Sequence, residues 1–156
     1  MFSSNLLGPY VLTNVISLLL VIVAILSPKI TRWGFVLIFS GAAIANGVIA
    51  INDPGSYLEF GRSALVGGYS DFINGFFREH TVPIVLAIAF CQLCIAFLLT
   101  RKDPLLKLGV IGASIFLAAI LPLGMGSAVP APLLMIVALA VMYRRQKLDA
   151  MPAPQI

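Results

Sequence analysis

The sequence predicts an all-α integral membrane protein, a bundle of five transmembrane helices that forms one domain over residues 1–156. Two observations predict this class. Hydrophobic residues make up 60% of the chain and charged residues only 10%, whereas soluble domains are about half apolar and a quarter charged. The apolar residues also fall in five long stretches, and the short segments between them carry almost every charge. Because water cannot accommodate so much apolar surface, we place the chain in a bilayer.

The expected spans are residues 10–26, 33–51, 81–99, 105–123 and 130–143. A hydrocarbon core of about 30 Å requires about 20 helical residues, within a range of about 17–25. The middle three stretches meet this length, the first lies at the lower limit, and the last is short, so its neighbours or a local thinning of the bilayer must compensate. The first stretch is expected to be a retained span because residues 1–9 lack the Lys or Arg of a signal peptide.

Basic residues predict the orientation of the chain, since Lys and Arg near span ends are held on the cytoplasmic side. This predicts an outer N-terminus, an outer loop over 52–80 and a cytoplasmic tail over 144–156, in a membrane of the bacterial inner type. A nucleic-acid partner is not expected, because the net charge of +4 follows from this topology and not from a basic face. Only Arg62 and Arg78 fall on the outer side, and the eight residues of the opposite side are Lys29, Arg32, Arg101, Lys102, Lys107, Arg144, Arg145 and Lys147.

The outer loop is longer than a turn requires and is expected to form amphipathic helices on the membrane surface. Ser56 and Glu59 have the spacing of a capping box, which predicts a helix over 57–65, and Gly67 with Gly68 then breaks the pattern. A second helix is predicted by apolar residues spaced along one face, and it would serve as a lid over the bundle or as a gate for a lipid-like ligand. That face consists of Tyr69, Phe72, Ile73, Phe76 and Phe77.

Polar residues inside the expected spans are uncharged, which disfavours a pump or a coupled transporter, since these need ionisable groups in the membrane. Asn14, Asn46 and Gln92 are expected to form hydrogen bonds between helices, and Asn46 and Gln92 are also candidates for binding a ligand. No metal site is expected, because the single histidine has no clustered partners. The candidates on the outer side for contacting a polar ligand or partner are Glu59, Arg62, Asp71, Arg78, Glu79 and His80.

Small residues four positions apart predict places where two helices approach closely, either inside this bundle or against another subunit. The pairs are Gly41 with Ala45, Ala43 with Gly47, and Gly109 with Ala113.

Cys91 and Cys94 form a CxxC pair in the third expected span, and on a helix this spacing puts both sulfurs on one face. Such a pair can cycle between dithiol and disulfide, and it resembles the redox pair of vitamin K epoxide reductase and of quinone-reducing disulfide oxidoreductases. Those families add a second cysteine pair, which this chain lacks. Apolar surroundings also suppress the reactive thiolate, so the default interpretation is two inert small residues.

The chain also resembles a known family over residues 32–145. The resemblance rests on a span that opens with Arg32, Gly34 and Gly41, on the helical outer loop, and on residues 90–99 followed by Arg101. These features are similar to the DoxX-like family of small four-helix membrane proteins, which implies a four-helix core preceded here by an extra N-terminal span. Members are linked to membrane redox systems, including a subunit of thiosulfate:quinone oxidoreductase, which implies an accessory or quinone-side role. The family often has Glu at the position of Gln92, and no catalytic residue is carried over.

Three functions follow as expectations. The first is a non-catalytic accessory or scaffold subunit of a larger membrane complex, with lipid and other membrane subunits or a second copy as partners. The alternative is a quinone- or lipid-binding redox protein that uses the pair of Cys91 and Cys94. The third is a small transporter, although the sequence contains no polar path for one.

Overall fold

The computed structural model describes residues 4–149, except for the side chains of residues 4–7, 62–63 and 125–126. Every element in this range is helical, as predicted, whereas the end of the expected cytoplasmic tail, 150–156, lies outside the described residues. The elements are α1 (Ser4–Leu26), α2 (Pro28–Asn52), η1 (Pro54–Glu59), α3 (Phe60–Ser63), α4 (Gly67–Phe72), η2 (Ile73–Phe77), α5 (Thr81–Leu99), α6 (Leu105–Ile120), η3 (Leu121–Ser127) and α7 (Ala131–Asp149).

Four of the described helices are long and apolar enough to cross a membrane: Gly8–Leu26, Pro28–Asn52, Thr81–Leu99 and Leu105–Gly124. They correspond to the first four expected spans, and the third has the bounds that the sequence predicts. The fifth expected span forms most of α7, a helix of 19 residues. α7 is not among the four because its C-terminal turns contain Arg144, Arg145 and Lys147.

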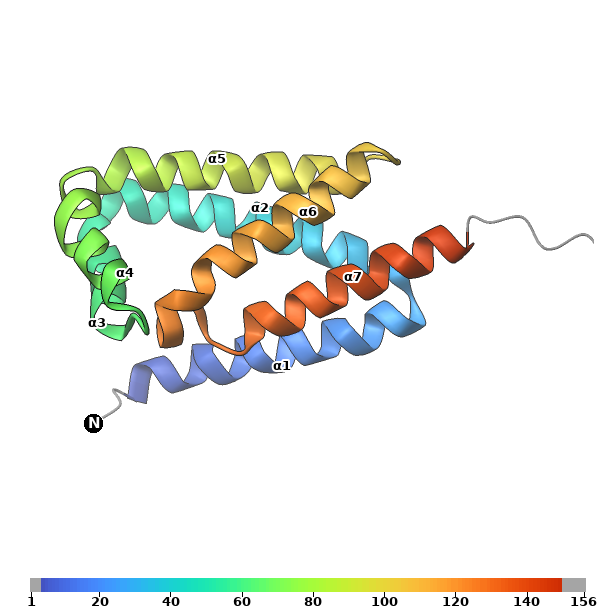
Figure 1. Ribbon diagram of the computed structural model, residues 1–156, viewed down its shortest axis with the longest axis horizontal. Helices are drawn as coiled ribbons and strands as arrows, with labels where there is room; N and C mark the ends of the chain where they lie inside the picture. Colours follow the sequence, from blue (N-terminus) through green and yellow to red (C-terminus); the bar gives the residue numbers. More distant parts are fainter. Residues whose placement is uncertain (1–3, 150–156) are drawn as a thin grey trace, which may run out of the picture.

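The long helices run antiparallel to their neighbours in the chain (Figure 1). α2 packs along α5, α1 packs along α7, and α6 crosses obliquely while contacting both α5 and α7. A single residue, Ser27, links α1 to α2, with φ −148° and ψ 87°. Pro28 starts α2 directly after it, because the fixed φ of proline suits the first helical position and its missing N–H has no partner to lose there.

Eight of the ten basic residues, all except Arg62 and Arg78, belong to one end of the bundle, where the α1–α2 link, the α5–α6 junction and the C-terminal part of α7 lie together (Figure 1). Two of them satisfy carbonyl groups of helix ends. Arg145 Nη2 donates to the carbonyl oxygen of Ile25 over 2.8 Å. Arg32 donates to the carbonyl oxygens of Leu99 and Arg101. The last carbonyls of a helix have no intrahelical partner and carry partial negative charge, so these guanidinium groups stabilise the ends of α1 and α5.

Of the predicted small-residue contacts, one lies inside the bundle and another is exposed on its surface. Gly109 packs against α5, since a Cβ atom there would lie 3.0 Å from Leu98 Cβ and 3.0 Å from Leu99 N. One turn later Ala113 is fully buried, so this pair is an intramolecular seam. Gly41 and Ala45 are exposed on α2, and a Cβ at Gly41 would meet no atom within 4 Å.

The first helix of the outer loop differs from its prediction. Helical turns begin at Pro54, and Ser56 lies inside η1, where its hydroxyl donates over 2.9 Å to the carbonyl oxygen of Asp53. The prediction that Ser56 and Glu59 form a capping box is therefore wrong, because Ser56 is not the residue that precedes the helix. Pro54 decides the start, because proline is favoured at the first helical position and shifts it two residues ahead of Ser56.

The second loop helix is also rearranged. The break between the two loop helices falls at residues 64–66, and α4 already begins at Gly67, so Gly67 and Gly68 are not the break that the sequence predicts. Gly75 inside η2 leaves helical geometry with φ −98° and ψ −108°. The predicted apolar face is consequently divided. Ile73 and Phe77 are buried, as expected for an inner face, but Phe72 is 46% exposed and Phe76 is 58% exposed.

The link between α6 and α7 is irregular and is fastened by α1. Gly124 has φ 63°, a left-handed conformation that favours glycine, and the carbonyl groups that follow have partners on α1. Tyr10 donates to the carbonyl oxygen of Val129 over 2.6 Å, and Asn14 Nδ2 donates to that of Ala128 over 3.1 Å. These two bonds tie α1 to the link between α6 and α7, so α1 helps to hold this end of the bundle together.

Candidate functional site

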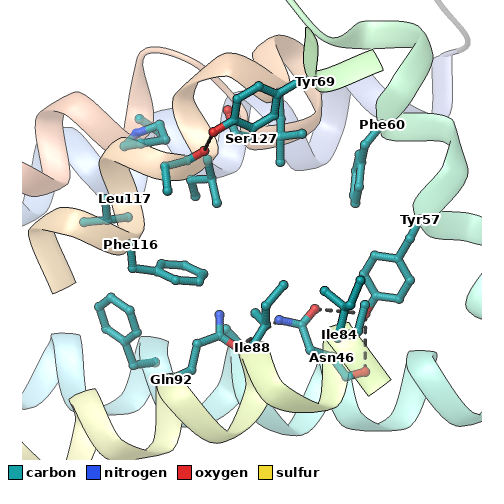
Figure 2. A pocket seen from close by; sticks show the side chains of 18 of the residues that line it. Asn46, Tyr57, Phe60, Tyr69, Ile84, Ile88, Gln92, Phe116, Leu117 and Ser127 are labelled. Carbon is teal, nitrogen blue, oxygen red and sulfur yellow. Dashed lines mark hydrogen bonds between the residues drawn. The ribbon is translucent and has the colours of Figure 1, made fainter. Parts of the chain in front are cut away.

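A cavity of about 540 Å³ lies inside the bundle, beneath the loop helices (Figure 2). α2 and α5 form one wall, and α6, η3 and the start of α7 form the other. Its volume falls within the range of about 300–1,000 Å³ that is typical of small-molecule sites. Most of the lining is aliphatic or aromatic, including Phe39, Ile88, Phe116, Leu117 and Met135. The site therefore suits a ligand that is mostly hydrocarbon.

The outer loop covers this cavity, because it is fastened to the far end of α6. Tyr69 donates a hydrogen bond of 2.9 Å to the carbonyl oxygen of Ala119, and the N–H of Leu65 donates to that of Pro122 over 2.8 Å. Both acceptors lie where α6 passes into η3, so the two bonds hold the loop against this end of α6. Phe60 and Tyr69 consequently extend over the cavity from the loop side (Figure 2).

One polar cluster interrupts the apolar lining and joins three elements. Asn46 Nδ2 on α2 donates to Gln92 Oε1 on α5 over 2.9 Å. The hydroxyl of Tyr57, on η1, lies 2.9 Å from Asn46 Oδ1 and 3.3 Å from the main-chain oxygen of Asn46. Asn46 and Gln92 are the two candidates that the sequence placed inside the membrane. The structure brings them together in the hydrogen bond between helices that was expected.

The Gln92 side chain is 3% exposed, yet its Nε2 has no hydrogen-bond partner among the described residues. Figure 2 shows this nitrogen facing into the cavity. Among the described residues the buried side-chain atom without a partner is Asn14 Oδ1, and Gln92 Nε2 is instead accessible from the cavity. The wall of the cavity thus contains an unmet hydrogen-bond donor, which an oxygen atom of a ligand would satisfy.

Tyr57 is held as a neutral donor. Its side chain is 8% exposed, and burial raises the pKa of its phenol above the usual value, because the charged phenolate would lose its solvation. The hydroxyl therefore stays protonated at neutral pH and keeps donating towards Asn46.

The outer candidates whose side chains the structure describes are not among the residues that line the cavity; they are Glu59, Asp71, Arg78, Glu79 and His80. Arg78 and Glu79 border a second, smaller recess of about 340 Å³ beside Pro54. His80 is exposed, with its ring stacked on that of Phe76 at 4.5 Å between centroids and its Nδ1 3.0 Å from the carbonyl oxygen of Phe76.

Glu59 and Asp71 are exposed, whereas the side chain of Arg62 lies outside the described side chains. Within the described residues, no group of three or more His, Cys, Asp or Glu side chains is placed to hold a metal ion.

Cys91 and Cys94 are exposed, unbridged thiols on α5. They flank Gln92 along the helix, but Gln92 faces inward and neither cysteine is among the cavity lining. Both are therefore located outside the core, and the structure does not place the CxxC pair next to the cavity.

Sequence reasoning placed Tyr69 on the apolar face of the second loop helix, but it missed the hydrogen bonds by which Tyr57 and Tyr69 connect the outer loop to the polar cluster and to α6. A signal was present, since a tyrosine among apolar residues usually finds a hydrogen-bond partner for its hydroxyl. The partners, Asn46 and the carbonyl of Ala119, lie 11 and 50 residues away in the chain, so spacing could not reveal them.

The fold and the cavity define an integral membrane helical bundle with a largely apolar site. No family model, no curated protein and no solved structure matches this chain. The similarity to the DoxX-like family therefore stays a prediction.

Proposed function

We propose that this protein binds a small, largely apolar molecule from the bilayer, a quinone or a lipid, in the cavity beneath its loop helices. The observation that carries this proposal is the cavity of about 540 Å³, with its apolar walls and the cluster of Asn46, Gln92 and Tyr57. A few polar groups in an apolar pocket are the usual composition of a small-molecule site. Binding within the membrane also explains why the site needs no opening to water.

The proposal includes five spans, with α7 as the fifth. α7 buries Ala138, Leu139 and Met142 completely in the bundle, so it belongs to the core. Arg144 and Arg145 follow at the basic end, where long side chains extend to the membrane surface. We place this end in the cytoplasm and the N-terminus with the outer loop on the other side of a bacterial inner membrane. Reporter fusions after Asp149 and within the outer loop test this orientation, which is contradicted if both report the same side.

The binding experiment compares two tryptophan substitutions on α2. Ala42 lines the cavity, whereas Ala45, three residues further along the same helix, is exposed on the bundle surface. Ala42→Trp fills the site and should abolish ligand binding, and Ala45→Trp should leave it unchanged. Wild-type protein and both variants are extracted into lipid nanodiscs from the same cells, and the molecules that accompany each are identified by mass spectrometry.

The expected result is a quinone or lipid that is enriched with wild-type protein and Ala45→Trp and lost from Ala42→Trp. A matching profile for all three proteins would overturn the proposal, provided that Ala42→Trp elutes as a folded, monodisperse species.

An accessory role in a larger complex is a second candidate, and it is compatible with ligand binding. It is favoured by the exposed face of α2 with Gly41 and Ala45, where a helix of another subunit could approach closely. Stoichiometric co-purification of another membrane protein, reduced by Ala45→Trp, supports this role. A solitary protein in mild detergent argues against it.

The redox form of the alternative has less support, because Cys91 and Cys94 do not line the cavity. Replacing both cysteines by serine tests it. Unchanged quinone reduction by native membranes that depend on this protein would remove the pair from consideration.

A further inference from the structure

We infer that the cavity binds an uncharged amphiphile through a carbonyl oxygen, which accepts a hydrogen bond from Gln92 Nε2. This inference rests on the proposed function and names the chemistry of the ligand head. Two sources supply such a head, the ring carbonyl of a quinone and the ester carbonyl of an acylglycerol.

The direction of the hydrogen bonds in the polar cluster shows that Gln92 offers a donor, not an acceptor, to a ligand. Tyr57 donates to Asn46 Oδ1, and Asn46 Nδ2 donates to Gln92 Oε1, so each side-chain carbonyl already accepts a bond. The amide of Gln92 is therefore left with its N–H groups, which face the cavity (Figure 2). The cluster presents a hydrogen-bond donor to the cavity, so the ligand atom that binds there must be a hydrogen-bond acceptor.

The network also holds the Gln92 amide in this orientation. Rotating that amide alone by half a turn would set its NH₂ against the NH₂ of Asn46, and two donors repel. In this arrangement Asn46 Oδ1 accepts from the hydroxyl of Tyr57. Because the ring of Tyr57 packs in the loop that covers the cavity, the donor at Gln92 is set before any ligand arrives.

The surroundings specify an uncharged head. No described side chain that lines the cavity carries a charge at neutral pH. A carboxylate or phosphate beside Gln92 would therefore be a buried charge without a counter-ion. A carbonyl head needs only the donor of Gln92, whereas the proton of a hydroxyl head also needs an acceptor, such as the second lone pair of a side-chain carbonyl that already accepts one bond.

The remaining lining accommodates the hydrocarbon part of the ligand. Phe116 lines the cavity near Leu117 (Figure 2), and Phe39 meets its ring edge to face at 5.8 Å between ring centroids. Their rings, with Leu117, present an apolar wall to which an alkyl or isoprenoid chain can pack.

The test measures the affinities of four probes that share a ten-carbon chain. Binding is measured by isothermal titration with the full-length protein in nanodiscs, and empty nanodiscs are the reference. The probes are decyl-benzoquinone, monodecanoylglycerol, decylbenzene, which lacks the carbonyl, and decanoate, which carries a charge. We expect at least one of the two carbonyl probes to bind about tenfold more tightly than decylbenzene, as the gain of one hydrogen bond predicts. The tighter of the two identifies the source.

Gln92→Leu removes the donor, and it should lower the affinity of the carbonyl probe to that of decylbenzene. Binding of decylbenzene itself should be unchanged, which also shows that the variant is folded. Cys91→Ala alters the preceding residue on the outer side of α5 and should leave every affinity unchanged.

The outcomes separate the inference from the proposed function. If decylbenzene or decanoate binds wild-type protein as tightly as the carbonyl probes, the inference is overturned while the proposed function stands. If none of the four probes binds, the proposed function fails as well. The comparison of probes on wild-type protein decides the matter even where Gln92→Leu does not fold.

Discussion

The hydroxyl group of Tyr69 donates a hydrogen bond of 2.9 Å to the main-chain carbonyl of Ala119, and this contact fastens the outer loop to the end of α6. The two residues lie 50 positions apart, on opposite sides of α5 in the chain. The bond holds α4 across the cavity, so it couples closure of the site to the position of one helix end.

The first prediction concerns this contact. Tyr69→Phe keeps the ring over the cavity and removes the hydroxyl, so we expect a loss of about 0.5–1.5 kcal/mol in the free energy that holds the loop closed. Hydrogen exchange of residues 64–74 should become faster, and a bound ligand should dissociate several-fold faster.

The control for Tyr69→Phe is Tyr10→Phe, which removes a tyrosine hydrogen bond to a carbonyl at another place, Val129. It should reduce stability by a similar amount without accelerating exchange in the loop. Equal exchange of residues 64–74 in wild-type protein and Tyr69→Phe would show that the bond does not hold the loop.

The second prediction concerns the polar cluster. Asn46→Leu leaves Gln92 Oε1 without its partner and the Tyr57 hydroxyl with only the main-chain oxygen of residue 46 at 3.3 Å, so we expect unfolding to become easier by about 1–3 kcal/mol. Tyr57→Phe should cost less, because it removes one partner of Asn46 and leaves the bond to Gln92. The two effects should not add, since the residues share one network. Thermal unfolding of the single and double variants in detergent measures this, and strict additivity would disprove the coupling.

The third prediction compares two glycines inside helices. Gly109→Ala sets a Cβ atom 3.0 Å from Leu98 Cβ and Leu99 N, so α5 and α6 must separate, and we expect a loss of about 1–3 kcal/mol. Gly41→Ala meets no atom within 4 Å and should be neutral or stabilising by up to about 1 kcal/mol, because alanine favours helices. Thermal unfolding ranks the two variants. A more stable Gly109→Ala protein would mean that the α5–α6 contact is looser than described.

The fourth prediction concerns alkaline pH. Burial raises the pKa of Tyr57 in the folded protein above its usual value of about 10. The neutral phenol is thus favoured by folding, and its contribution to stability is fully present below pH 10 and is lost as the pH rises through the folded-state pKa. Tyr57→Phe should remove that part of the alkaline destabilisation. The measurement is the melting temperature of both proteins between neutral pH and about pH 11, and parallel curves would contradict the assignment to Tyr57.

Several features followed from local pattern. The bounds of α5 coincide with the predicted span, because a long apolar run between polar ends is limited by the thickness of the bilayer. The basic residues gathered at one end for a related reason, since the turns between antiparallel spans alternate between the two ends of the bundle. The starts of two helices were less predictable. α2 begins at Pro28 and η1 at Pro54, because proline is favoured at the first helical position, whereas the apolar pattern and the capping box predicted starts at residues 33 and 57.

The sequence by itself determined a chain of membrane-spanning helices, their approximate lengths and the separation of charge between the two ends, because these depend on hydrophobicity and chain connectivity. Only the tertiary structure decided which face of each helix is internal. α5 is apolar on nearly every side, so its pattern does not show that Cys91 is exposed. The amide of Gln92 predicts a contact between helices, but only the structure identifies Asn46 as its partner. In lipid both faces are apolar, and packing against distant elements alone selects the inner one. The cavity and its hydrogen-bond donor therefore emerged only when α2, α5 and the outer loop met.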